Sequence, residues 1–184
     1  MKAIKYILIS AIVLLLGCGK DPEESSISGT VTIDNNTYFK NSTYYINGYS
    51  FSMGKMISTL EDPGPDISVY ADPFDPQMLY FDSNVPLSTF AKIGEFSSET
   101  EAKNAFNNLS DVPANATWAG LANPVLANQV WIFKSGRMEK YTKIRITHTF
   151  AEQRYNAPLQ RYFDYAECTF EYVHQPDGSL TFPK

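Results

Sequence analysis

Strict alternation of apolar and polar residues near the C-terminus is the clearest structural signal in the chain. Gln129–Lys134 is an apolar run, residues 135–137 suit a turn, and residues 141–150 then alternate in type. A period of two places successive side chains on opposite faces of a strand. We therefore predict two antiparallel strands joined by a short turn, a loop centred on residues 156–158, and a third strand at residues 165–174.

The alternation also predicts which face of each strand meets the core. In the second strand we expect these residues to point inward: Thr142, Ile144, Ile146, His148 and Phe150. We expect their neighbours to face water: Tyr141, Lys143, Arg145, Thr147 and Thr149. In the third strand, the inward set is Ala166, Cys168, Phe170, Tyr172 and His174.

Earlier segments add shorter strands and one helix. Residues 28–33 alternate, and two runs on either side of Asn47-Gly48 predict a hairpin with a type I′ turn. Short strands are predicted at residues 67–70 and 78–81, separated by the proline-rich breaks 62–65 and 72–76. Ser98 and Glu101 form a capping box, and the apolar residues that follow recur with helical spacing: Ala102, Ala105, Phe106 and Leu109.

These elements predict one mostly β domain, built of antiparallel sheets with one short α-helix. Residues 110–128 are expected to be irregular. The 14% aromatic content, with twelve Tyr and twelve Phe, is typical of a β-rich extracellular domain. The net charge of −5 argues against a nucleic-acid-binding protein, which would be basic.

The N-terminus has the features of an export signal. Lys2 and Lys5 precede the apolar run 7–16, and Leu15-Leu16-Gly17-Cys18 resembles the lipobox of bacterial lipoproteins. The resemblance implies cleavage after Gly17 and acylation of the Cys18 sulfur, which anchors the chain by acyl chains. A transmembrane anchor is the alternative, but the apolar run is shorter than the roughly 20 residues a bilayer requires.

The chain is therefore divided into a signal peptide (1–17), an acidic tether (18–27) and a β domain (28–184). Lys20, Asp21, Glu23 and Glu24 in the tether resemble the signal that sends lipoproteins of Bacteroidetes-type bacteria to the cell surface. The alternative is a solvated spacer. We expect an outer-membrane, lipid-anchored protein displayed on the cell surface.

No catalytic motif is present, so an enzyme is not expected. There is no Gly-x-Ser-x-Gly sequence, and Cys168 is expected to be a small buried hydrophobe within its strand. A calcium site or a carboxylate pair remains an alternative for the acidic residues Asp62, Asp66, Asp72, Asp75 and Asp82. Their spacing fits no known calcium loop, and no metal site is predicted.

Two histidines lie on the predicted inward faces, where each is either a satisfied core or rim residue or a candidate haem ligand. His148 is expected to pair near Ala166, so that His174 lies about 25 Å away, too far for both to bind one iron. One His or one Met would then dominate. The candidates are His148, His174, Met78 and Met138.

Six segments carry a family resemblance: residues 30–34, 49–54, 130–134, 140–146, 169–173 and 175–179. They resemble segments of HmuY-like lipoproteins, the surface haem-binding proteins of Bacteroidetes. The resemblance implies an antiparallel β fold and the capture of haem for delivery to an outer-membrane receptor. The family's iron ligands lie ahead of the strand that corresponds to Gln129–Lys134, where residues 113–128 contain neither His nor Met.

Two functions therefore remain open. The first is a surface lipoprotein that binds haem, with haem as cofactor and an outer-membrane receptor as partner. The second is a surface lipoprotein that binds a protein or a glycan and has no haem site. Exposed aromatic residues without a metal ligand would favour the second.

Overall fold

The computed structural model describes residues 27–84, 87–136 and 139–183. Of these residues 54% are in strands and 7% in helix, and every strand pairing is antiparallel. This confirms the prediction of a mostly β domain with one helix. No helix in the described part of the chain is long and apolar enough to cross a membrane.

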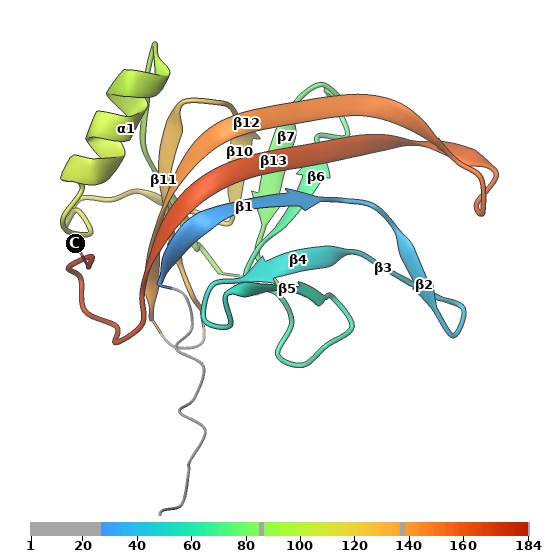
Figure 1. Ribbon diagram of the computed structural model, residues 1–184, viewed down its shortest axis with the longest axis horizontal. Helices are drawn as coiled ribbons and strands as arrows, with labels where there is room; N and C mark the ends of the chain where they lie inside the picture. The colour runs from blue at the N-terminus through green and yellow to red at the C-terminus, as the bar shows by residue number, and fades with distance from the viewer. Residues whose placement is uncertain (1–26, 85–86, 137–138, 184) are drawn as a thin grey trace, which may run out of the picture.

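The largest sheet has six strands, in the order β1-β13-β12-β11-β8-β9, of which Figure 1 shows the first four side by side. In that order the strands are β1 (Ser28–Asp34), β13 (Arg161–Gln175), β12 (Tyr141–Asn156), β11 (Gln129–Lys134), β8 (Phe90–Glu95) and β9 (Trp118–Ala119). A second sheet contains β10 (Leu121–Val125), β7 (Leu79–Asp82) and β6 (Ser68–Ala71). Two hairpins complete the strands: β2 (Tyr38–Lys40) with β3 (Thr43–Tyr45), and β4 (Asn47–Ser50) with β5 (Lys55–Ser58).

The core lies between the inner face of the six-stranded sheet and the layer formed by β4, β6, β7 and β10. Aromatic rings fill it, and Phe51, Phe81 and Phe170 are each fully buried. The Phe81 and Phe170 rings meet edge to face at 5.8 Å, an arrangement that aromatic quadrupoles favour. Cys168 is also buried in this core, as predicted, and burial raises the pKa of its thiol.

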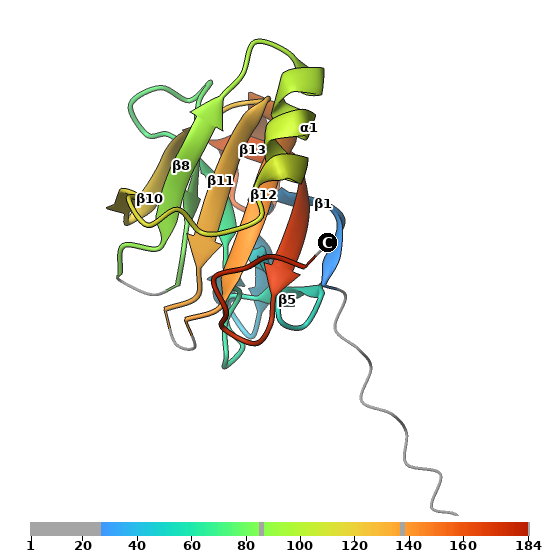
Figure 2. The same ribbon diagram turned by 90° about the vertical axis from the view of Figure 1, so that its left-hand side faces the viewer.

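Helix α1 (Glu99–Asn108) lies against the outer face of the large sheet at one end (Figure 2). Ser98 caps it as predicted, its hydroxyl accepting a hydrogen bond from the Glu101 amide at 3.3 Å. The helix begins at Glu99, one residue after this cap. Ala102 and Phe106 form its buried face.

Because α1 covers part of the outer face, the expectation that Lys143 and Arg145 face water is wrong. Lys143 Nζ donates to the Phe106 and Leu109 carbonyl oxygens, both at 2.9 Å, and so binds the free carbonyls at the end of the helix. Arg145 is buried beneath the start of the helix and pairs with Glu171 at 2.9 Å.

A β-bulge in β12 reverses the predicted faces beyond Ile146. Ile146 pairs with Phe170 and His148 pairs with Thr169, so Thr147 is an extra residue without an opposite partner. One extra residue exchanges inward and outward positions. His148 and Phe150 therefore lie exposed on the outer face, and their prediction as core residues is wrong.

The β12–β13 hairpin is longer than predicted and turns at residues 157–160. The turn lies further along the chain than the predicted loop, so His148 pairs with Thr169 rather than near Ala166. β11 ends its pairing at Arg145, and β1 ends opposite Glu167. Residues 151–166 thus extend past both neighbouring strands as a two-stranded ribbon, called the arm below and visible at the right of Figure 1.

The predicted turn at Asn47-Gly48 is wrong. Both residues are in β4, and the chain turns at residues 51–54 instead. A second turn, between β2 and β3, places Asn41 and Ser42 at φ of 50° and 67°. Gly48 is needed for close packing, since a Cβ atom built there would lie 2.4 Å from the Ile67 carbonyl oxygen and 2.6 Å from Pro65.

The segment expected to be irregular contains two strands, β9 and β10. They are short, and a register shift lies between Ala122 and Val125, where Pro124 interrupts β10. Alternation is lost over so few residues, which is why the sequence pattern did not reveal them.

We predict that Gly48→Ala lowers the free energy of unfolding by about 2 kcal/mol, because the new methyl group overpacks the contact with β6. Urea unfolding of the two proteins measures the difference. Gly120→Ala is the matched control, since its Cβ atom would find its nearest neighbour at 3.9 Å. Equal losses in both variants would show that Gly48 does not fill a packing role.

Candidate functional site

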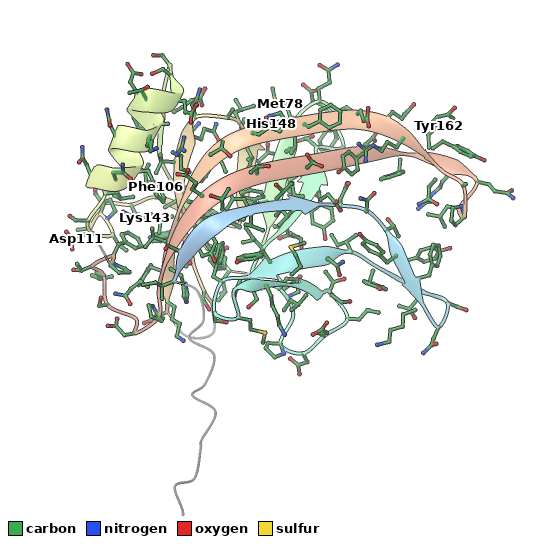
Figure 3. The ribbon with its side chains drawn as sticks, viewed as in Figure 1. Met78, Phe106, Asp111, Lys143, His148 and Tyr162 are labelled. Atoms are coloured by element: carbon green, nitrogen blue, oxygen red, sulfur yellow. The ribbon has the colours of Figure 1, made fainter. Side chains whose placement is uncertain are left out.

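The candidate haem ligands do not come together in the described structure. Cys18 and Met138 lie outside the described residues. Met78 precedes β7 and is half-exposed, His148 lies on the outer face of β12, and His174 is buried on the inner face of β13 (Figure 3).

The two histidines are far apart. His148 lies opposite Thr169 and therefore five positions from His174 along β13, which is roughly 17 Å at about 3.3 Å per residue. They also point to opposite faces of the sheet. The separation is smaller than the predicted one, but it still exceeds the reach of two axial ligands on one iron, about 4 Å.

His174 borders a small cavity of about 90 Å³. The imidazole is 3% exposed, its Nδ1 lies 2.9 Å from the Thr142 hydroxyl, and its Nε2 has no hydrogen-bond partner among the described residues. Burial, together with the nearby charge of Lys140, lowers the pKa of His174 to about 4. The imidazole is therefore neutral at physiological pH.

The opposite wall of this cavity is formed by Asp66. Its carboxylate accepts a hydrogen bond from the Phe51 amide at 2.7 Å, and burial raises its pKa. The remaining lining residues are Ser50, Ser52, Pro63, Gly64, Phe133, Ser135 and Lys140. The volume accommodates about three water molecules at roughly 30 Å³ each, whereas pockets for larger ligands measure about 300 to 1,000 Å³. The cavity is therefore too small for haem.

A larger hollow of about 550 Å³ opens on the surface near the end of β7. Its described lining residues are Asp82, Ser83, Asn84, Leu87, Ser88, Gly120 and Leu121. None of these is a His, Met or Cys residue. Within the described ranges, no three His, Cys, Asp or Glu side chains gather closely enough to hold a metal ion.

Exposed aromatic side chains gather at the end of the molecule that carries the arm. Tyr155 and Tyr162, at the tip of the arm, are 55% and 65% exposed, and their rings meet at 5.3 Å. On the β2–β3 hairpin Tyr38, Phe39 and Tyr44 are 40%, 43% and 52% exposed. We call these five residues the aromatic end.

Asn35, which lies between β1 and β2, bonds the chain just before the β2–β3 hairpin to the arm. Its side-chain amide donates to the Asp164 carbonyl oxygen and accepts from the Ala166 amide, both at 2.9 Å. Tyr38 follows three residues later, so it lies within about 10 Å of Asn35 along the chain. Figures 1 and 3 show both hairpins at the same end, with Tyr162 at the tip of the arm.

The outer face of the arm is stiffened by stacked side chains. The Arg154 guanidinium lies 3.3 Å from the centre of the Tyr165 ring, and Tyr165 donates a hydrogen bond to Glu167 at 2.7 Å. As a result Tyr165 is only 2% exposed, although it lies beyond the core. Its burial, its hydrogen bond to Glu167 and the nearby charge of Asp34 raise the pKa of Tyr165 to about 12. Side-chain contacts therefore stabilise the arm in addition to its backbone hydrogen bonds.

No protein-family model matches the chain, and no curated protein is significantly similar to it. The resemblance to HmuY-like lipoproteins therefore stays a prediction.

Tyr155 and Tyr162 were not among the predicted site residues. The sequence does carry a signal for them: residues 151–156 continue the strand, and a tyrosine stands on each side of the turn at residues 157–160. The predicted loop centred on residues 156–158 ended the second strand too early, so neither tyrosine was assigned to a strand.

We predict that His174 makes stability depend on pH between about 6.5 and 4. The folded protein keeps this side chain neutral, so its contribution is complete above the ordinary pKa of 6.5 and is lost as the pH falls towards 4. The loss amounts to about 3 kcal/mol. Unfolding measured at several pH values should therefore show a weaker dependence in His174→Gln than in the natural protein.

The control is Gly120→Ala, which removes no titratable group and should leave the pH dependence as it is. If the natural protein and His174→Gln lost stability in parallel from pH 6.5 to 4, His174 would not be the buried neutral group described here.

Proposed function

We propose that this chain is a surface lipoprotein that binds saccharides through its aromatic end. Acyl chains on Cys18 hold it in the outer membrane, and the tether 18–27 carries the domain away from the membrane. The observation that supports this function is the concentration of five exposed aromatic residues on two hairpins at one end of the domain.

The chemistry of exposed tyrosine suits a sugar. The C–H groups on one side of a pyranose ring carry partial positive charge and stack on the negative face of an aromatic ring. Polar groups close to the rings then bind the hydroxyl groups. Gln153 and Asp164 are paired with each other two residues along the strands from the Tyr155–Tyr162 pair, and therefore on the same face of the arm.

A protein partner fits this surface less well. The central part of a protein interface is depleted of charge and forms one packed apolar patch. Here Gln153 and Asp164 lie next to the Tyr155–Tyr162 pair on the same face of the arm. Rings bordered by an amide and a carboxylate are better suited to a small hydroxylated ligand.

Haem is the second candidate, and one observation favours it. A tyrosine phenol can be an axial ligand of haem iron, and paired rings can stack on a porphyrin. The exposed pair Tyr155–Tyr162 therefore offers a haem contact that does not depend on His174, whose cavity is small.

We predict that the full chain binds a set of glycans on an array and that Tyr155→Ala/Tyr162→Ala lowers the affinity at least about tenfold. The two rings are highly exposed, so the substitutions leave the core intact. Phe74→Ala is the matched control: Phe74 is 96% exposed but lies in the loop between β6 and β7, and its loss should leave binding unchanged.

Hemin titration of the same three proteins separates the two functions. Tight hemin binding that is lost in the double tyrosine variant, with no glycan bound by the natural protein, would replace the saccharide by haem. Equal glycan binding by all three proteins would show that the aromatic end is not the binding surface.

A further inference from the structure

One edge of the arm is an unpaired sheet edge. β11 pairs with β12 as far as Arg145, and a last bond joins the Asn128 amide to the Ile146 carbonyl oxygen at 3.0 Å. From residue 147 to residue 156, no strand in the described ranges pairs with this side of β12. Unpaired edges of this kind are templates for another strand.

The opposite edge of the arm, on β13, is occupied by Asn35. The Asn35 amide donates to the Ala166 carbonyl oxygen at 3.1 Å, and the Asn35 side chain bonds the Ala166 amide and the Asp164 carbonyl oxygen, both at 2.9 Å. A single side chain thus takes the place of a neighbouring strand. The two edges of the arm therefore differ, and the β12 edge is the open one.

The same bonds determine which groups the open edge presents. Ala166 and Asp164 direct their backbone groups towards Asn35 and away from β12. In an antiparallel pair, two residues opposite each other either both face one another or both face away. Ala151 is opposite Ala166 and Gln153 is opposite Asp164, so both direct their N–H and C=O groups to the open edge, as does Tyr155 by alternation.

We propose that this edge pairs with the same edge of a second copy of the chain, in antiparallel orientation, with Gln153 on the two-fold axis. Each copy then offers Ala151, Gln153 and Tyr155, which form three facing pairs and about six hydrogen bonds across the axis. The interface is isologous, so it closes after two copies. This inference goes beyond saccharide binding and does not depend on it, but its test rests on the lipid anchor of the proposed function.

Charge complementarity selects both the occupant and the register. Glu152 and Arg154 lie on the outer face of the arm, and their side chains are 43% and 39% exposed. With the axis at Gln153, Glu152 of each copy lies opposite Arg154 of the other. An axis at either of these two residues would instead place like charges directly across the interface, which is destabilising. The edge is therefore complementary to itself in the register centred on Gln153.

Such a short interface is weak in free solution, because a pair of three-residue edges buries little surface. Anchoring to one membrane raises the effective concentration of the copies and favours their pairing. The experiment is therefore done with the full chain in the membrane of the expressing cell.

The test is a cross-link at the axis. In a hydrogen-bonded pair the two Cα atoms lie about 5.5 Å apart, within the disulfide range of roughly 4.4 to 6.8 Å. Full-length chain carrying Gln153→Cys should form a covalent dimer after mild oxidation, seen on a non-reducing gel. The natural chain is the background control, in which Cys168 is buried and cannot react.

Ala151→Cys tests the register. It has the same outward orientation, but in the proposed register the two copies of residue 151 lie four positions apart, roughly 13 Å. It should therefore stay monomeric. A monomeric Gln153→Cys chain at high membrane density, or stronger cross-linking of Ala151→Cys, would overturn the proposal.

Charge exchange gives a second readout. In the Gln153→Cys background, Glu152→Arg or Arg154→Glu alone places like charges across the axis and should reduce the covalent dimer several-fold. The double exchange restores opposite charges and should restore the dimer. Equal dimer in all four chains would mean that the self-complementary charges do not select the partner, and would contradict the assignment of a second copy.

Discussion

The antiparallel pairing of β12 with β13 is the contact on which the rest of the structure depends. It runs from Tyr141 opposite Gln175 to Asn156 opposite Arg161, with one bulge at Thr147. No other pairing of the described strands is as long. Because the neighbouring strands are shorter, the same ribbon serves two purposes. Its first half is the centre of the six-stranded sheet, and its second half is the arm that carries the exposed tyrosines.

The two halves differ in what covers them. In the first half, the inner face packs on the aromatic core and the outer face lies beneath α1, where Lys143 and Arg145 are buried with hydrogen-bonded partners. Carbonyl oxygens accept from Lys143 and the Glu171 carboxylate accepts from Arg145, which offsets the cost of burying these charges. Arg145 Nη1 has no hydrogen-bond partner among the described residues and lies 3.6 Å from the Glu99 carboxylate. In the second half no other layer covers the outer face, and the inner face meets the core only at the base of the arm, through Ala151 and Ala166. Stacking of Arg154 on Tyr165 takes over the role of packing there.

The bulge at Thr147 stands between these halves and explains much of what the sequence did and did not predict. Alternation correctly predicted the three C-terminal strands, their antiparallel order and the buried Cys168, because that signal is local. The single extra residue exchanged the faces of His148 and Phe150, and alternation cannot anticipate such a change. Likewise, Asn47-Gly48 has the sequence of a turn, yet both residues lie in β4. Glycine is required at position 48 because Ile67 and Pro65 approach too closely for a side chain.

The tertiary contacts that decide the candidate site have no local pattern. The burial of Lys143 depends on a helix some forty residues earlier, and the closure of the β13 edge depends on Asn35, 131 residues before Ala166. The sequence left open a function that would require exposed aromatic residues. It could not show that the tyrosines lie at the tip of a ribbon with one open edge.

Native-state hydrogen exchange of the arm amides tests this account most directly. If the arm is an ordered ribbon with an open β12 edge, the amides of Phe150, Glu152 and Arg154, which face β13, should exchange slowly. Those of Ala151, Gln153 and Tyr155 should exchange rapidly when the chains are dilute and monomeric. Rapid exchange at all six positions would show that the arm does not form, and slow exchange at all six in the monomer would show that its edge is already covered.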